Sequence, residues 1–252
     1  MGVGKYTPND AVAGDMGWKP PAVKQWTHIL RHWCRCTKME NSRINYKVFQ
    51  WSVRKSSYKI KNWSYQVMEV LKLYNYENFC NINANFLDKN IISQIEEKIF
   101  DRFKNNWCAR IASYGTGSKL RTYKLFKFSY CTEPYLKQFL PLRYRSAFAK
   151  FRCGVAPLKI ETGRYERKDI HERVCFNCSN TVEDEKHVLL NCPLYEDLRQ
   201  TMFIDILSIN NNFSELSDEE KFIYLFNNDM IFNIVAKTCH NILMRRNSLL
   251  YK

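Results

Sequence analysis

The sequence lacks the signatures of several protein classes. It contains no Asp-Asp pair of the kind found in a two-metal polymerase palm, and no G-x-S-x-G, P-loop or HExxH motif. Its longest uninterrupted apolar run extends only from Phe222 to Phe226, whereas a membrane-spanning helix needs roughly 18 apolar residues. The N-terminal residues include no apolar region typical of a secretory signal. We therefore expect a non-catalytic chain with no membrane role, located in the nucleus or the cytoplasm.

Glycine and proline are also scarce, with 8 and 7 among 252 residues, while apolar residues make up 45% of the chain. This composition is globular and excludes collagen-like and linker-like sequences. The charge is strongly basic, because 39 Lys and Arg accompany 25 Asp and Glu, for a formal net charge of +14. A charge of this size favours a polyanionic partner. Residues 1–152 contain 27 of the cations and all 6 Trp, so the basic field belongs to the first three-fifths of the chain.

Hydrophobic periodicity predicts a mostly α fold. The Gly and Pro residues within 1–24 predict an extended arm, and the helical spacing of Trp26, Leu30 and Trp33 predicts a helix over about 22–39. Further helices are predicted over about 41–51, 62–75, 87–112, 140–152, 193–209 and 217–249, and the last of them is broken near Asn227 and Asn228. The expected cap of the helix over 41–51 is Asn41 or Ser42, that of the helix over 62–75 is Ser64, and that of the helix over 87–112 is Asp88. Residues 113–128 are predicted to be a loop with a short strand.

These elements suggest four consecutive segments. An extended arm, 1–24, precedes a basic helical domain, 25–152. A zinc-knuckle segment, 153–200, follows, and C-terminal helices, 201–252, complete the chain. The expected architecture is therefore a helical region followed by a small zinc knuckle and C-terminal helices.

Four potential metal ligands form a C-x2-C-x8-H-x4-C pattern: Cys175, Cys178, His187 and Cys192. Zinc favours four N or S ligands in a tetrahedron, and a C-x2-C turn supplies two thiolates from one knuckle. The acidic residues 183–185 are typical of the first turn of a helix, which places His187 on that helix and Cys192 at its end before Pro193. Because four protein ligands complete the coordination shell, the sequence predicts one structural Zn²⁺.

A second group of potential ligands comprises His28, His32, Cys34 and Cys36. The two thiols of a C-x-C pair point apart on a helix, so this group is interpreted as a helix face rather than as a second metal site. The remaining cysteines are isolated and are interpreted as small buried side chains.

The residues around the knuckle resemble a known family. The likeness lies in residues 151–154 (FRCG), 157–158, 160–165 (IETGRY), 182–185 (VEDE) and 192–195 (CPLY), together with Arg173 and the four ligands. These residues are similar to the C-terminal zinc-knuckle region of non-LTR (LINE-type) retrotransposon polyproteins, downstream of the reverse transcriptase. Residues 3–18 (VGKYTPNDAVAGDMGW) also resemble the stretch that follows the polymerase module in these elements.

This resemblance implies a region that binds element RNA or target DNA while an upstream polymerase copies RNA at a nick. The four ligands match the ligand positions of the family, and Arg164 and Arg173 match basic positions that flank the knuckle. The polymerase aspartates and the apurinic-type endonuclease of the family are not in this sequence. The resemblance therefore implies a non-catalytic piece of the polyprotein, with an inactive transposon remnant as an alternative.

Aromatic side chains interleaved with cations are typical of surfaces that bind single-stranded or structured RNA. We therefore predict a nucleic-acid-binding module, with RNA favoured over DNA as its partner. The cations expected to contact phosphate are Arg143, Arg145, Lys150, Arg152, Arg164 and Arg173. The alternative is a protein-interaction domain, in which the basic half is a solvated surface and an acidic C-terminal group docks a protein partner. That group comprises Glu215, Asp218, Glu219 and Glu220.

Overall fold

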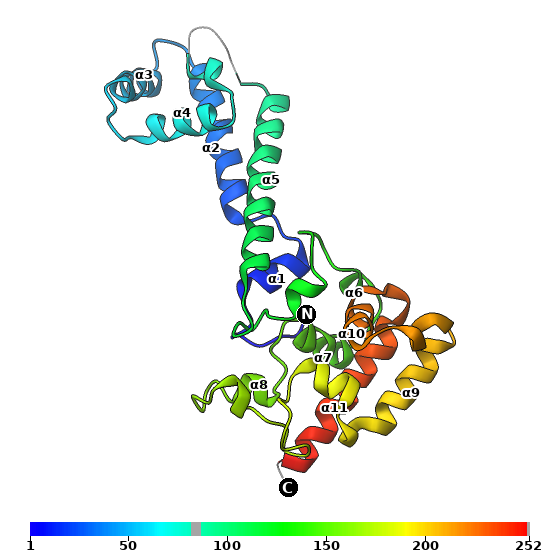
Figure 1. Ribbon diagram of the computed structural model, residues 1–252. Helices are drawn as coiled ribbons and strands as arrows, with labels where there is room; N and C mark the ends of the chain where they lie inside the picture. Colours follow the sequence, from blue (N-terminus) through cyan, green and yellow to red (C-terminus); the bar gives the residue numbers. More distant parts are fainter. Residues whose placement is uncertain (82–86, 251–252) are drawn as a thin grey trace. The chain divides into compact units, whose positions relative to one another are not determined.

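The computed structural model describes residues 1–81 and 87–250, and their regular secondary structure is helical (Figure 1). The β pairing found in these residues is one isolated antiparallel bridge between Val174 and Val182. The predicted mostly α fold is confirmed. None of the described helices combines the length and the apolar character needed to cross a membrane.

The helices lie as follows along the chain: α1 (Asn9–Met16), α2 (Pro21–Thr37), α3 (Ile44–Ser57), α4 (Trp63–Leu73), α5 (Lys89–Ser113), α6 (Pro134–Lys137), α7 (Leu142–Arg152), α8 (Lys159–Thr162), α9 (Glu196–Leu207), α10 (Asp218–Asn227) and α11 (Phe232–Leu250). The predicted break near Asn227 and Asn228 separates α10 from α11. Long-range contacts divide the chain into two compact units. Unit 1 comprises Met1–Trp18 and Trp107–Lys252, and unit 2 comprises Lys19–Asn106. These units group residues by contact, so they differ from the four consecutive segments predicted from the sequence.

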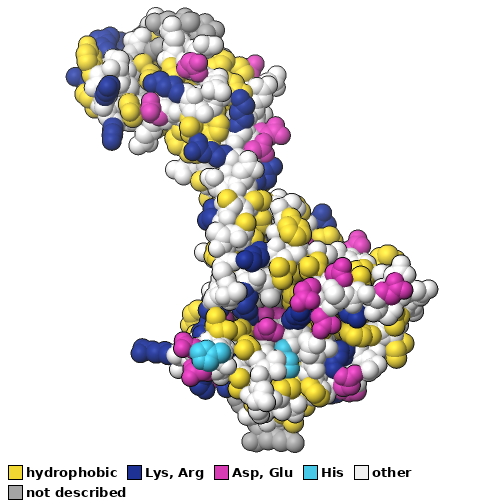
Figure 2. Space-filling model, in the orientation of Figure 1, with side chains coloured by type: hydrophobic (Ala, Val, Ile, Leu, Met, Phe, Trp, Pro, Cys, Tyr) yellow, Lys and Arg dark blue, Asp and Glu magenta, His cyan; other side chains and the backbone are white. Residues whose placement is uncertain are grey.

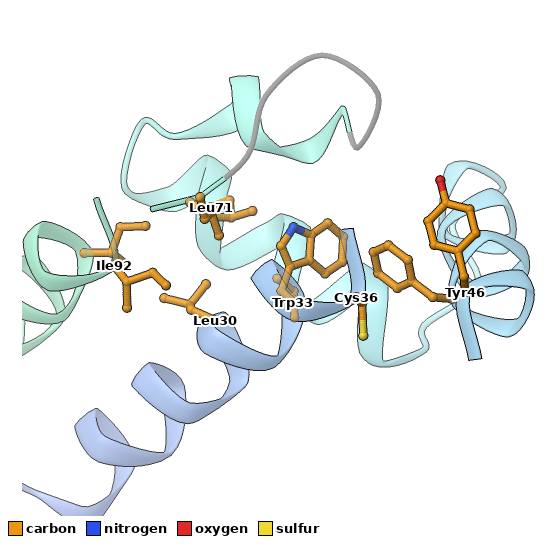
Figure 3. Packing of buried hydrophobic residues seen from close by; sticks show 10 residues of the cluster. Leu30, Trp33, Cys36, Tyr46, Leu71 and Ile92 are labelled. Carbon is orange, nitrogen blue, oxygen red and sulfur yellow. The ribbon is translucent and has the colours of Figure 1, made fainter. Parts of the chain in front are cut away.

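Unit 2 has a core formed by α2, α3, α4 and the first part of α5 (Figure 3). Leu30 and Trp33 are buried in it, as their helical spacing predicts, and the Trp33 ring meets Phe49 edge-on at 5.0 Å between centroids. Helix α2 begins at Pro21. Proline lacks a backbone N–H, but at the first position of a helix an N–H would have no acceptor within the helix, so nothing is lost. The core of unit 2 comprises Leu30, Trp33, Cys36, Tyr46, Phe49, Val67, Leu71, Leu87, Ile92 and Ile95.

Two of the predicted helix caps of unit 2 are wrong and one is confirmed. Asn62, rather than Ser64, caps α4 by accepting a hydrogen bond from the Tyr65 N–H, because Ser64 lies buried inside the helix. Arg43, rather than Asn41 or Ser42, is the residue before α3. The Asp88 carboxylate accepts a hydrogen bond from the Ile91 N–H at 2.7 Å and caps α5 as predicted.

The expected extended arm over 1–24 is wrong, because it contains α1 and the start of α2. Gly14 and Gly17 serve close packing and a helix end rather than an extended backbone. A Cβ on Gly14 would lie 2.3 Å from the Trp107 ring, so only glycine lets α1 approach that indole. Gly17 has a φ of 62° and ends α1 in the left-handed conformation.

The core of unit 1 forms where α7 packs against α11. The Phe148 ring lies 5.3 Å from Phe226 and 5.2 Å from Phe232, between ring centroids. The strand predicted within 113–128 is wrong, because the structure has a 3-10 helix at Tyr123–Leu125 and no strand there. Tyr123 and Phe126 are both buried at a spacing of three, which suits a 3-10 turn facing one core.

Candidate metal centre

The four predicted ligands come together in unit 1. One potential ligand atom from each of Cys175, Cys178, His187 and Cys192 lies within 4.8 Å of all the others. The Sγ atom of Cys192 is 3.8 Å from the Sγ atoms of both Cys175 and Cys178. A tetrahedral ion with metal–sulfur bonds of about 2.3 Å requires sulfur atoms about 3.8 Å apart. The group can therefore hold a metal ion without rearrangement of these sulfur pairs.

The first two ligands lie on a tight turn. Cys175 donates its backbone N–H to the Thr181 carbonyl at 2.8 Å, beside the bridge between Val174 and Val182. Ser179 has a φ of 59° and donates its N–H back to the Cys175 carbonyl at 2.9 Å. This left-handed residue reverses the chain directly after Cys178, so both thiols face the same side of the turn.

The second pair of ligands depends on a π-helical turn at His187–Asn191. In a regular α-helix, residues five apart point about 140° away from each other. Here the Cys192 N–H donates to the His187 carbonyl at 2.8 Å, five residues earlier, which widens the turn and returns Cys192 to the side of His187. The x4 spacing thus fits a single metal site because of this irregular turn.

The helix that carries His187 begins at Glu185, two residues after the start of the predicted acidic first turn at Glu183. Asp184 accepts a hydrogen bond from the His187 N–H at 2.8 Å and caps the helix. The neighbouring carboxylates of Glu183 and Glu185, which were predicted to lie in a first helical turn, are both fully buried.

Two arginines bind these buried carboxylates and anchor the knuckle. Arg246 of α11 donates to both oxygens of Glu183, at 2.9 and 2.7 Å. Arg121 donates to Glu185 at 2.8 Å. Burial raises the pKa of Glu185, and the positive charge of Arg121 opposes that rise. Neither arginine is predictable from the sequence, because its partner lies more than 60 residues away and no local pattern links the two.

Burial shifts the pKa values of three of the four side chains. Burial raises the pKa of the Cys175 thiol and raises that of Cys192 to about 12. Burial lowers the pKa of His187, which favours the neutral imidazole that a metal requires. Its Nε2 atom is buried and has no hydrogen-bond partner in the part of the chain that the structure describes. A nitrogen in this state is free to coordinate an ion.

No protein-family model, curated protein or solved structure matches this chain. The interpretation of the site therefore depends on its own geometry. Three thiols and one imidazole converge on one point, and they can hold a metal ion.

Two of the cations predicted to contact phosphate are buried. Arg152 is 0% exposed and lies within ion-pair distance of Asp15 and Glu133. Arg173 donates to the backbone carbonyls of Lys168, at 2.8 and 3.0 Å, and Ile160, at 2.9 Å. Their guanidinium groups are occupied inside unit 1, so the structure does not present them to a ligand.

The other four predicted cations differ in their surroundings. Arg143 is exposed, whereas Arg145 is half-buried and donates to the Leu140 carbonyl at 3.0 Å. Lys150 lines a cavity of about 250 Å³, and Arg164 pairs with Glu161 at 2.8 Å. Only Arg143 among the six predicted cations is therefore largely open to solvent.

The acidic C-terminal group of the alternative hypothesis is partly occupied as well. Glu219 forms an ion pair with Lys186, and Asp218 accepts a hydrogen bond from Asn191 at 3.0 Å. Glu220 completes a capping box with Ser217 at the start of α10. These carboxylates bind α10 to the knuckle or cap a helix.

The second group of potential ligands lies along α2 in unit 2. The Cys36 Sγ atom is 3.6 Å from the His32 Nε2 atom, but Cys34 donates instead to the Leu87 carbonyl at 2.7 Å. Cys34 therefore points away from the pair, in keeping with the interpretation of this group as a helix face.

Proposed function

We propose that this protein is a zinc-stabilised nucleic-acid-binding module that favours RNA. The observation that carries the metal part is the convergence of three sulfur atoms and one imidazole at distances that suit tetrahedral coordination. Soft thiolate ligands with one imidazole favour Zn²⁺ among common cellular metals. Four protein ligands leave no position for a catalytic water, so the proposed role of the ion is structural.

The proposed ion stabilises a segment that has little other regular structure. On the order of 10 kcal/mol of binding free energy is typical of a structural zinc site. The buried pairs of Glu183 with Arg246 and of Glu185 with Arg121 join the knuckle to the rest of unit 1. Zinc binding is therefore expected to stabilise the packing of α11 as well as the knuckle.

The nucleic-acid part of the proposal is supported by charge. Unit 2 contains 16 Lys and Arg but only 7 Asp and Glu. A cationic surface with few acids favours a polyanion, and exposed Trp residues add stacking surfaces for bases. Trp51 of unit 2 is 58% exposed. The likeness to LINE-type polyproteins supports an origin in the C-terminal, non-catalytic part of such a protein.

The metal part is tested by Cys178→Ser. We expect this variant to lose its zinc, measured as metal per purified chain, and to expose residues 170–200 to limited proteolysis. The control is Cys131→Ser, because Cys131 is exposed and lies outside the cluster. A Cys178→Ser protein that retains one zinc per chain and the thermal stability of the wild type contradicts the proposal.

The nucleic-acid part is tested by binding of the zinc-loaded full chain to labelled single-stranded RNA across a salt series. Release of counterions makes the logarithm of affinity fall with the logarithm of salt, by about 0.7 per phosphate contact for a single strand. Steep salt dependence supports the proposal. Absence of binding at low salt by a folded, zinc-loaded chain contradicts it and favours a protein-interaction domain or an inactive remnant.

A further inference from the structure

A second basic feature lies in unit 2, which contains none of the six cations predicted to contact phosphate. Between Glu40 and Glu69 the chain has no Asp or Glu, and it contains six cations: Arg43, Lys47, Arg54, Lys55, Lys59 and Lys61. Five of them are exposed and Lys55 is half-buried. No ion pair involves any of the six in the described residues, since the carboxylates of unit 2 that form pairs lie on other elements. Their charge is therefore available to an external anion.

The same segment exposes large apolar side chains. One face of α3 is already used, because Tyr46 and Phe49 are buried in the core of unit 2. On the outer face Trp51 is 58% exposed, and Tyr58, just after the helix, is 73% exposed. Ile44, Val48 and Ile60 are exposed as well. We call this group of six cations and five apolar residues the α3 surface.

The order of side chains on α3 separates apolar groups from cations. Ile44, Val48 and Trp51 follow one another at i, i+4 and i+7, which forms one stripe along a helix. Arg43, Lys47 and Arg54 follow at i, i+4 and i+11, which forms a second row beside it. Figure 2 shows dark blue and yellow side chains next to one another at the edge of the molecule where α3 lies in Figure 1.

A cavity of about 330 Å³ opens beside the apolar stripe and shares Val48 with it. This volume is at the lower end of the range of small-ligand pockets. Rings of Trp63 and His32 line the cavity, together with the side chains of Asn45 and Ser52. Flat apolar walls with a few hydrogen-bonding groups suit a planar, polar heterocycle.

We propose that the α3 surface is the site where this protein binds single-stranded nucleic acid, an inference that rests on the proposed function. Phosphates lie along the row of Arg43, Lys47 and Arg54, while bases stack on Trp51 and one base enters the adjacent cavity. A single strand carries phosphates on one side and bases on the other, which matches the two parallel rows of α3. An anionic membrane would meet the cations, but an acyl chain offers no partner to the hydrogen-bonding groups of Asn45 and Ser52 in the cavity.

The experiment compares variants of the full, zinc-loaded chain in binding to labelled single-stranded RNA over a salt series. The double variant Lys47→Ser/Arg54→Ser is expected to lower the magnitude of the log–log salt slope by about 1.4, since each lost contact removes about 0.7. Trp51→Ala is expected to weaken binding roughly 5- to 150-fold, as for the loss of one stacked base. These side chains are exposed, so circular dichroism should show unchanged folding.

The matched control is Lys24→Ser/Arg102→Ser, which removes two exposed cations from α2 and α5 of the same unit. It is expected to change the slope much less than the α3 variant. If both double variants lower the slope equally, binding follows net charge and the inference is wrong.

Two further outcomes separate this inference from the proposed function. A wild-type chain that binds no RNA overturns both. A wild-type chain that binds RNA, with α3 variants of unchanged affinity and slope, overturns the α3 site and leaves the proposed function standing. Vesicles that contain phosphatidylserine provide the membrane arm. Loss of vesicle binding in the α3 variants, with RNA binding intact, overturns the inference in favour of a membrane surface.

Discussion

Replacement of Arg152 by alanine is expected to destabilise unit 1 strongly rather than to remove a contact to nucleic acid. The guanidinium lies 2.7 Å from the Glu133 carboxylate and 3.3 Å from that of Asp15, measured between N and O atoms. It also donates to the Phe226 carbonyl at 2.7 Å, and its central carbon is 4.7 Å from the centre of the Phe126 ring. Arg152 therefore connects segments that lie far apart in the sequence.

The magnitude follows from the charges that the substitution leaves behind. Asp15, Glu133, Arg152 and Lys127 form a buried group with two charges of each sign. Burial alone would lower the pKa of Arg152, but the two carboxylates outweigh it and raise that pKa, so the guanidinium stays charged. Removal of one partner from a buried ion pair typically costs about 3–5 kcal/mol. Domain stabilities are typically about 5–15 kcal/mol, so the loss is a large fraction of the total.

The assay is urea unfolding of the zinc-loaded chain, followed by circular dichroism, for Arg152→Ala, Arg152→Lys and Arg143→Ala. We expect a large decrease in the unfolding free energy for Arg152→Ala and a smaller one for Arg152→Lys, which keeps the charge but loses donors. Arg143 is exposed, and its substitution should change stability by less than about 0.5 kcal/mol. An Arg152→Ala protein that is as stable as the wild type but binds RNA more weakly would refute this reasoning.

Two other predictions concern a glycine and an ion pair of unit 1. Gly154→Ala should destabilise the protein by on the order of 2 kcal/mol in thermal unfolding. The φ of Gly154 is 64°, and an added Cβ would lie 1.8 Å from the Lys119 carbonyl oxygen. Gly117→Ala is the control, because a Cβ at Gly117 meets nothing within 4 Å. Burial would raise the pKa of Asp10, but hydrogen bonds from Arg110 and Tyr114, together with the charge of Arg110, outweigh it and hold that pKa below the ordinary 3.8. Asp10→Asn should therefore lower the unfolding free energy at pH 7, and the difference in unfolding free energy from the wild type should shrink below pH 3.8. An equal difference at pH 3 and pH 7 in urea unfolding would contradict this prediction.

The parts of the structure that were predictable from sequence depend on local spacing. The helices of unit 2 follow from apolar residues three and four positions apart, as for Trp26, Leu30 and Trp33 in α2. The convergence of the four potential ligands was predictable for the same reason. The C-x2-C turn and the turn from His187 to Cys192 are both short, and a single bridge between Val174 and Val182 supports the first of them.

Long-range partners could not be predicted in this way. The sequence placed Arg152 at a phosphate because it lies among other cations, but its carboxylate partner Asp15 is 137 residues away. Asp15 of α1 also accepts hydrogen bonds from the hydroxyls of Tyr123 and Tyr135, which lie 108 and 120 residues away. A cation buried by such partners and a cation left in solvent have the same local sequence pattern.

The two units differ in how many of their cations are paired with carboxylates, and this difference bears on the proposed binding of a polyanion. Unit 1 contains 23 Lys and Arg and 18 Asp and Glu, and at least 12 of its cations form ion pairs within the described residues. In unit 2 such pairs involve Lys19, Lys72 and Lys104 among 16 cations in the described residues. A cation already paired with a carboxylate gains less binding free energy from a phosphate, because the carboxylate repels the phosphate unless it is displaced. The unpaired cations of unit 2 thus support the proposal that a polyanion binds at the α3 surface rather than at the arginines near the four potential metal ligands.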